Sequence, residues 1–260
     1  MRAWLRGSFA EFNDDEYRDT LRFTYSDGVL QPGSTDHSAT FTGARIYKAL
    51  RHREQDNKIA TLNGGGEYTF ANGAVWDATL AWARSEQSYP HRDELVYRSG
   101  SQTLSYDTTD HYAPTYSPFA STYYSTPTNY SFRENTFRSN TTEQEDVSFK
   151  TNVEIPTVLS GREVTLKFGA KYATRDVYAD EERYRDRTST APVNPGLLAP
   201  LLSDRPSQNY DYDLGVKFDH GRVADYFDAV RAVSTAAAAR RLPQSISADY
   251  TANEDILAGY

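Results

Sequence analysis

Side chains able to do chemistry are plentiful in this chain, but few have the spacing of a catalytic or metal site. No Ser-His-Asp arrangement and no glycosidase pair of carboxylates stands out among the many candidates. The histidines are scattered, and no two have metal-ligand spacing: His37, His52, His91, His111 and His220. The sequence therefore predicts no catalytic residue, no metal site and no cofactor, and a protein that is not an enzyme.

Two acidic clusters and one glycine run have plainer interpretations than ligand binding. Asp14 to Glu16 and Asp180 to Glu182 offer oxygen ligands for Ca²⁺, but neither has EF-hand spacing, and we interpret both as charged loop tips. Gly64 to Gly66 lacks the Lys-Ser/Thr that follows in a phosphate-binding loop. Inside a strand, such a run predicts a bend or a close neighbour.

A run of tyrosines is the strongest signal for ligand binding. It lies between Pro90 and Thr142, in a segment rich in Ser, Thr, Asn and Pro. Exposed aromatic rings stack on sugars or cover hydrophobic ligands at low entropic cost. We therefore predict ligand contacts, with packing between loops as the alternative, for Tyr106, Tyr112, Tyr116, Tyr123, Tyr124 and Tyr130.

The composition sets aside several classes of protein. The mean hydropathy of -0.72 is very polar, yet 20 Tyr and 12 Phe argue against disorder. No stretch is apolar enough for a membrane helix, and the absence of cysteine excludes disulfides and thiolate metal sites. A net charge of -8 disfavours a nucleic-acid partner. A barrel with a polar lumen fits, because only alternate strand residues need to be apolar.

Long alternating segments predict the strands. From Glu145 to Asp176, two strands alternate apolar and charged residues about a turn at Pro156 to Gly161. Each is roughly twice the 5–6 residues usual in globular sheets, and close to the 9–11 that cross a bilayer. Four more segments read the same way, with a tight Asn-Gly hairpin turn after the second: Arg2–Phe12, Asn57–Phe70, Trp76–Ser88 and Asp249–Tyr260.

Short and long connections alternate between these strands. The long ones are Asn13–Asp56, Pro90–Thr142 and Glu182–Ala248, and the last should carry a helix over Val223–Arg241. Outer-membrane barrels have short periplasmic turns and long extracellular loops. The sequence thus predicts an all-β fold, an antiparallel up-and-down transmembrane β-barrel segment of about six long strands with long extracellular loops.

The alternation also assigns the two faces of that barrel wall. Apolar residues should face lipid, with aromatic residues near both ends of the apolar band: Leu62, Trp76, Leu80, Phe149, Val153, Leu166 and Phe168. Polar residues on the other face should line the lumen: Asp77, Thr79, Lys150, Asn152, Lys167, Lys171 and Arg175.

Two short motifs resemble a known family. Leu166-Lys-Phe-Gly-Ala-Lys-Tyr172, with the charged extension after it, resembles a strand of TonB-dependent outer-membrane receptors. Ala252-Asn-Glu-Asp-Ile-Leu-Ala-Gly-Tyr260 resembles their E-x-x-x-A-G-Y strand opening. The chain is most similar to the large receptors of sphingomonads and caulobacters. The resemblance covers most of the chain and implies that 1–260 is part of a large plugged barrel, without the plug domain, the TonB box or the C-terminal strand.

The resemblance implies TonB-coupled uptake of a scarce nutrient, such as a glycan or a siderophore, across the bacterial outer membrane. The implied partners are outer-membrane lipid, the TonB energy-coupling complex and a small-molecule or oligosaccharide ligand. The start at Met1 lacks signal-peptide features, so we interpret the chain as an internal piece. Two alternatives stay open: a passive porin-like or adhesive barrel, which shares every strand feature, and a soluble carbohydrate-binding or hydrolytic β-domain.

Overall fold

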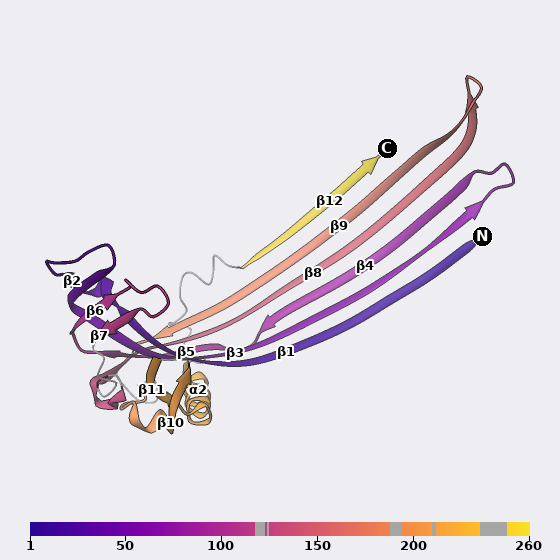
Figure 1. The fold of residues 1–260 in the computed structure, drawn as a ribbon. Helices are drawn as coiled ribbons and strands as arrows, with labels where there is room; N and C mark the ends of the chain where they lie inside the picture. The colour runs from indigo at the N-terminus through magenta and orange to yellow at the C-terminus, as the bar shows by residue number, and fades with distance from the viewer. Residues whose placement is uncertain (118–122, 124, 188–193, 210–211, 235–248) are drawn as a thin grey trace.

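Six long strands form one antiparallel sheet in the computed structural model. The structure describes residues 1–117, 123, 125–187, 194–209, 212–234 and 249–260. The strands pair in chain order, which confirms the predicted next-neighbour arrangement (Figure 1). In that order they are β1 (Arg2–Thr24), β3 (Ser38–Thr69), β4 (Val75–Tyr89), β8 (Tyr130–Leu159), β9 (Arg162–Asp186) and β12 (Tyr250–Gly259).

The two tight turns lie together at one end of the sheet, with the N-terminus (Figure 1). Ser160 and Gly161 both have positive φ, 52° and 77°, which is the type I′ geometry of a two-residue hairpin. At the Asn-Gly turn only Gly73 has a positive φ, 83°, and its N–H donates to the Phe70 carbonyl at 2.9 Å. That turn is therefore a type I turn closed by a glycine bulge.

Two of the three predicted long loops are largely strand, which corrects the sequence interpretation. Asn13–Asp56 lengthens β1 and β3, which pair without interruption from Arg2↔Glu67 to Thr24↔Arg45. Pro90–Thr142 holds the start of β8 and three short strands, β5 (Arg92–Ser99), β6 (Gln102–Asp107) and β7 (Thr115–Ser117). Polar residues pair here because charged neighbours across the strands form ion pairs, so polarity alone did not mark a loop.

The end of the sheet away from the turns carries a compact cap. We use this name for β2 (Val29–Leu30), β5, β6, β7, the hairpin of β10 (Leu202–Asn209) and β11 (Tyr212–Phe218), and helix α2 (His220–Ser234) (Figure 1). Three single-turn 3-10 helices complete the described part: Tyr25–Asp27, Pro127–Asn129 and Ala199–Leu201.

Helix α2 confirms part of the predicted helix and anchors the cap core. The Asp219 side chain accepts the backbone N–H of Arg222 at 3.0 Å, which explains the start at His220. Val223, Phe227 and Val230 are buried. They join Leu50, Leu95, Tyr97, Phe137 and Phe218 in the hydrophobic core. Residues 235–241 of the predicted helix lie outside the described part.

Beyond the cap, the sheet keeps a bare apolar face. The predicted lipid-facing residues share this face by strand register, and six of them are more than 40% exposed: Leu62, Trp76, Leu80, Phe149, Leu166 and Phe168. Val153 lies among them and is half-buried. Among the described strands, β1 and β12 each pair on one side only. None of the described helices is both long and apolar enough to cross a membrane.

Candidate ligand-binding face

The predicted lumen residues all lie on the face opposite the apolar one. Strand pairing aligns Thr79 with Lys150 and Lys150 with Lys171, and aligns Asp77 with Asn152. Asn152 is buried and donates to the Asp77 carboxylate at 2.8 Å. Lys167 pairs with Glu154 at 2.6 Å, and Arg175 with Asp146 at 2.7 Å. The sequence thus placed these seven residues on one side of the sheet, which we call the polar face.

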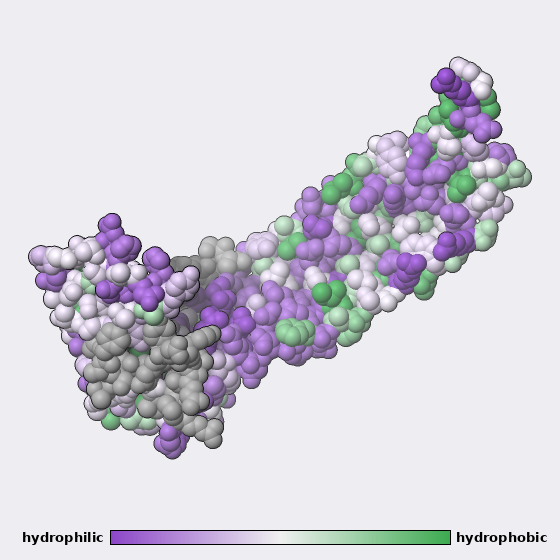
Figure 2. All heavy atoms as spheres, viewed as in Figure 1, coloured by the Kyte–Doolittle hydropathy of each residue, from purple (hydrophilic) through white to green (hydrophobic). Residues whose placement is uncertain are grey.

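Nearer the cap, the polar face becomes rich in arginine. Strand register brings seven guanidinium groups to one side: Arg18, Arg51, Arg53, Arg92, Arg138, Arg183 and Arg185. We call these residues the arginine cluster. Figure 2 shows hydrophilic residues concentrated where the sheet meets the cap, and more hydrophobic residues toward the turns. Sequence reasoning missed the cluster because its members come from five strands, and the segments that hold them were interpreted as loops.

Carboxylates satisfy only part of the arginine cluster. Glu16 pairs with Arg53 at 2.8 Å, and Glu181 with Arg138 at 2.6 Å. Among the described residues, Arg92 and Arg183 have no carboxylate partner. In addition, the Nε atoms of five members are buried without a hydrogen-bond partner: Arg51, Arg53, Arg138, Arg183 and Arg185.

The electrostatics of the arginine cluster favour an anion. Burial lowers the pKa of Arg92, and the neighbouring Arg138, Arg51 and Arg53 lower it further. Such mutual repulsion is relieved when a negative group binds among the guanidinium forks, which match carboxylate, sulfate and phosphate oxygens. The arrangement can therefore hold an anionic ligand.

The structure separates the six predicted ligand tyrosines. Tyr130 is 4% exposed within the cap core, which corrects its assignment to the ligand because a buried ring cannot stack on a sugar. Tyr123 packs against the same core, and Tyr112 is fully exposed. Tyr124 lies outside the described residues. Tyr106 and Tyr116 are cross-strand neighbours in β6 and β7.

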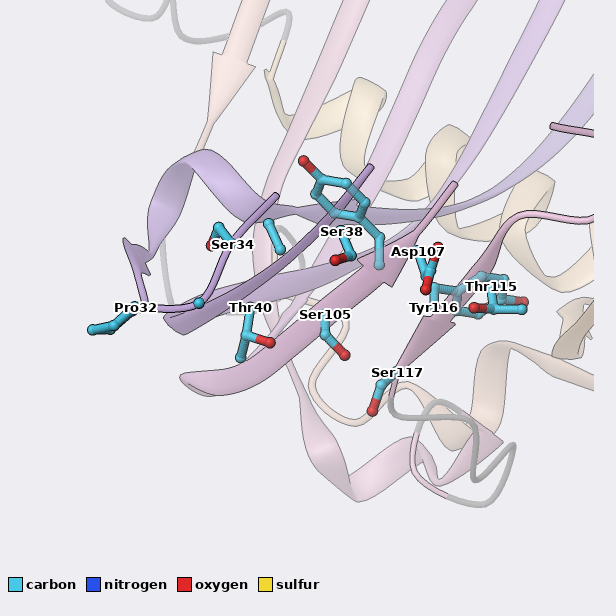
Figure 3. A pocket seen from close by; sticks show the side chains of 12 residues that line it. Pro32, Ser34, Ser38, Thr40, Ser105, Asp107, Thr115, Tyr116 and Ser117 are labelled. Atoms are coloured by element: carbon cyan, nitrogen blue, oxygen red, sulfur yellow. The ribbon is translucent and has the colours of Figure 1, made fainter. Parts of the chain in front are cut away.

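Tyr106 and Tyr116 line a polar pocket of about 270 Å³ at the outer edge of the cap. Ser38, Thr40 and Ser105 contribute hydroxyl groups to it (Figure 3). Tyr25 lies against Tyr106, with ring centroids 5.1 Å apart. Burial raises the pKa of Tyr25 to about 12, so its hydroxyl stays protonated and donates to the Ser105 carbonyl at 3.3 Å. Hydroxyl groups beside aromatic rings suit a sugar. Tyr106 and Tyr116, two of the six tyrosines predicted to contact a ligand, therefore meet in a pocket of that kind.

A mixed cluster of histidine and carboxylates is the other feature that the sequence interpretation missed. His52 and Glu54 of β3 and Asp15 of β1 lie on the apolar face, at the border of the cap. His52 and Glu54 are two residues apart on a strand, so they share a face. That spacing is a signal of a shared face only if the segment is a strand. The sequence predicts Asn13–Asp56 to be a loop, so the spacing of His52 and Glu54 is not recognised there.

A scan against protein-family models and a search of curated proteins both found no match.

Proposed function

We propose that this chain is part of the wall of an outer-membrane β-barrel receptor that takes up an anionic nutrient in a TonB-coupled process. The bare apolar face of the long sheet carries the proposal. Soluble proteins rarely leave a contiguous apolar surface of this extent uncovered. In a barrel wall that face contacts lipid, and the polar face with its arginines lines the lumen.

The dimensions of the sheet support a membrane span. On β8, the apolar face runs from Val147 to Ile155 with Thr151 as its one polar residue, a stretch close to the roughly 9–11 residues of a tilted transmembrane strand. Trp76 and Trp82 stand near the two limits of the band on β4. Their ring N–H groups donate to Thr151 and Glu145, each at 2.9 Å. Aromatic rings with one polar atom favour the membrane interface.

The arginine cluster supports an anionic ligand, such as an acidic oligosaccharide or a carboxylate-rich siderophore. The cap would form the outer mouth, with the pocket of Tyr106 and Tyr116 at its edge. A passive porin-like barrel would share the strands, and a soluble carbohydrate-binding domain would share the pocket. The apolar face disfavours the soluble domain. The receptor and the porin-like barrel differ in whether uptake is coupled to energy.

One experiment separates receptor, porin and soluble domain. The whole protein is expressed in a Gram-negative host and assayed for outer-membrane fractionation, heat-modifiable gel mobility and uptake. We expect membrane fractionation, a mobility shift and uptake that stops when TonB is deleted. Uptake independent of TonB would indicate the porin, and recovery in the soluble fraction without a mobility shift would exclude both barrels.

The ligand charge is tested with Arg183→Gln, which removes a guanidinium that no carboxylate of the described residues pairs with. Binding of an oligogalacturonate is compared with that of a neutral oligosaccharide of equal length. Loss of one charged contact should lower the affinity for the acidic oligosaccharide by about 10-fold or more and leave the affinity for the neutral one unchanged. Arg84→Gln is the matched control, because Arg84 pairs with Glu143 on the opposite face at 2.8 Å. Equal effects of the two variants would contradict the assignment.

A further inference from the structure

Three potential metal-ligand atoms converge on the apolar face where the cap begins. The Nε2 atom of His52 lies 2.9 Å from a carboxylate oxygen of Asp15 and 3.6 Å from one of Glu54. All three ligand atoms lie within 4.8 Å of one another. His52 is buried, whereas Asp15 and Glu54 are partly open to solvent, so an ion has a route to the site.

The separations suit a small divalent ion. Zinc binds histidine nitrogen and carboxylate oxygen at about 2.0–2.2 Å in tetrahedral geometry. Two ligand atoms of such a site are therefore about 3.3–3.5 Å apart. The two distances from His52 lie on either side of this value. Small rotations of the Asp15 and Glu54 side chains would place all three atoms at bonding distance from one ion, with a position left for water.

The charges around the site call for a cation. Among the described residues, the ion-pair partners of Asp15 and Glu54 are histidines, and neither carboxylate contacts a lysine or arginine. Two carboxylates therefore lie against one imidazole, and a divalent ion bound between them would reduce their mutual repulsion.

The ligands are held in place by their neighbours. The second oxygen of Glu54 lies 3.0 Å from Nδ1 of His91, an outer contact of the kind that orients a ligand carboxylate. The His52 ring stacks on Tyr17, with centroids 4.3 Å apart. The other side of Tyr17 stacks on His220 at the start of α2, at 4.5 Å. The cluster therefore touches β1, β3, the turn before β5 and the cap helix.

We propose that Asp15, His52 and Glu54 bind a divalent transition-metal ion of the Zn²⁺ type, which links strands β1 and β3 where the cap begins. Mixed nitrogen and oxygen ligands favour such an ion over Ca²⁺ or Mg²⁺, which take oxygen alone. The site lies on the side of the sheet opposite the arginine cluster. It is therefore separate from the ligand-binding face and goes beyond the proposed uptake function.

The test measures Zn²⁺ binding to the whole protein, purified in detergent without a histidine tag. Calorimetry with ZnCl₂ at pH 7 should give a saturable site, and CoCl₂ should give visible absorption bands of low-symmetry coordination. Asp15→Asn and Glu54→Gln keep the side-chain shapes, and each should lower the affinity for Zn²⁺ by about 10-fold or more. His91→Ala removes the outer contact of Glu54 and should lower that affinity by about 10–100-fold. Saturating Zn²⁺ should also raise the unfolding temperature of the parent protein and leave that of Glu54→Gln unchanged.

A second pair of histidines provides the control. The ring centroids of His37 and His111 lie 6.1 Å apart at the far edge of the cap. Because this pair is not part of the proposed site, His37→Ala should leave the affinity for Zn²⁺ unchanged. If His52→Ala fails to fold, Glu54→Gln decides the question, because it retains the volume and the hydrogen-bonding capacity of the site. Absence of Zn²⁺ binding, binding that survives Glu54→Gln, or binding lost in His37→Ala would each overturn the proposal.

Discussion

At the scale of single residues, two aromatic side chains lie over glycines on the polar face. Trp4 of β1 covers Gly65 of β3, where an added Cβ would lie 2.8 Å from the indole ring and 2.6 Å from the Ala78 carbonyl. Tyr260 covers Gly169 in the same way, and its hydroxyl donates to Asn152. Each pair joins an edge strand to its neighbour, so glycine supplies the space that lets a large ring lie flat on the sheet.

Gly65→Ala should therefore destabilise the protein by about 1–3 kcal/mol, because the methyl group has no room beneath the indole. Gly7→Ala is the matched control on the neighbouring strand. Its added Cβ would make ordinary contacts of 3.4 and 3.5 Å, so its stability should change little. Denaturant unfolding followed by tryptophan fluorescence measures both, and equal stability of the two variants would contradict the packing argument.

Tyr130 and Tyr112 show how differently two tyrosines of one run can act. Tyr130→Ala empties a position in the cap core and should cost about 3–5 kcal/mol, as large-to-small aromatic substitutions do. Tyr112→Ala removes a fully exposed ring and should leave stability unchanged. Thermal unfolding compares them. A small effect of Tyr130→Ala would mean that the cap core does not hold this ring.

At the scale of one strand, β4 shows how period-two alternation separates two environments. Leu80 and Ala81 are adjacent, yet Leu80 pairs with Phe149 on the apolar face and Ala81 with Ser148 on the polar face. Substitution by a charged residue should therefore affect stability differently at the two positions.

Leu80→Arg should destabilise the barrel in lipid by about 2–4 kcal/mol, the cost of a charge near the bilayer midplane. Ala81→Arg should be tolerated, because its neighbours are polar and water reaches that face. Folding into lipid vesicles at graded urea concentrations measures both variants. Tolerance of Leu80→Arg in lipid would show that this face does not contact the membrane.

At the scale of the whole molecule, one sheet face serves two purposes. Near the cap it is covered by α2 and the hairpin of β10 and β11, and beyond the cap it is bare. The cap therefore covers the apolar face of the strands where they extend past its bare region. This explains how β3 and β8 reach 32 and 30 residues without leaving apolar surface exposed along their whole length.

The three tryptophans report on this arrangement. Trp76 and Trp82 lie on the apolar face, and Trp4 lies on the polar face over Gly65. Brominated lipid acyl chains should quench the first two and spare Trp4. Quenching by these lipids is compared in a Trp76→Phe, Trp82→Phe double variant and in Trp4→Phe. It should be largely lost in the double variant and kept in Trp4→Phe. Stronger loss in Trp4→Phe would invert the assignment of the faces.

The sequence alone assigns the faces of most long strands, because alternation has a fixed period and one residue cannot face both sides of a sheet. It therefore placed Leu80 on the apolar face, Lys150 on the polar face and both tight turns. Trp4 interrupts the alternation of Arg2–Phe12, and nothing local in the sequence indicates the space above Gly65 that its ring occupies. The alternation of Asp249–Tyr260 groups Ile256 and Ala258 on the more apolar side of the segment, whereas pairing with β9 puts them on the polar face.

Strand pairing in three dimensions is needed to show which polar segments are strands and which residues meet across them. Arg92 and Arg138 are far apart in the chain, and so are Asp15 and His52. Register across five strands brings the arginines together, and pairing of β1 with β3 brings Asp15 to His52. A polar segment forms a strand when its neighbour supplies hydrogen bonds and opposite charge. That information lies in the partner strand, and a pattern read along one segment does not contain it.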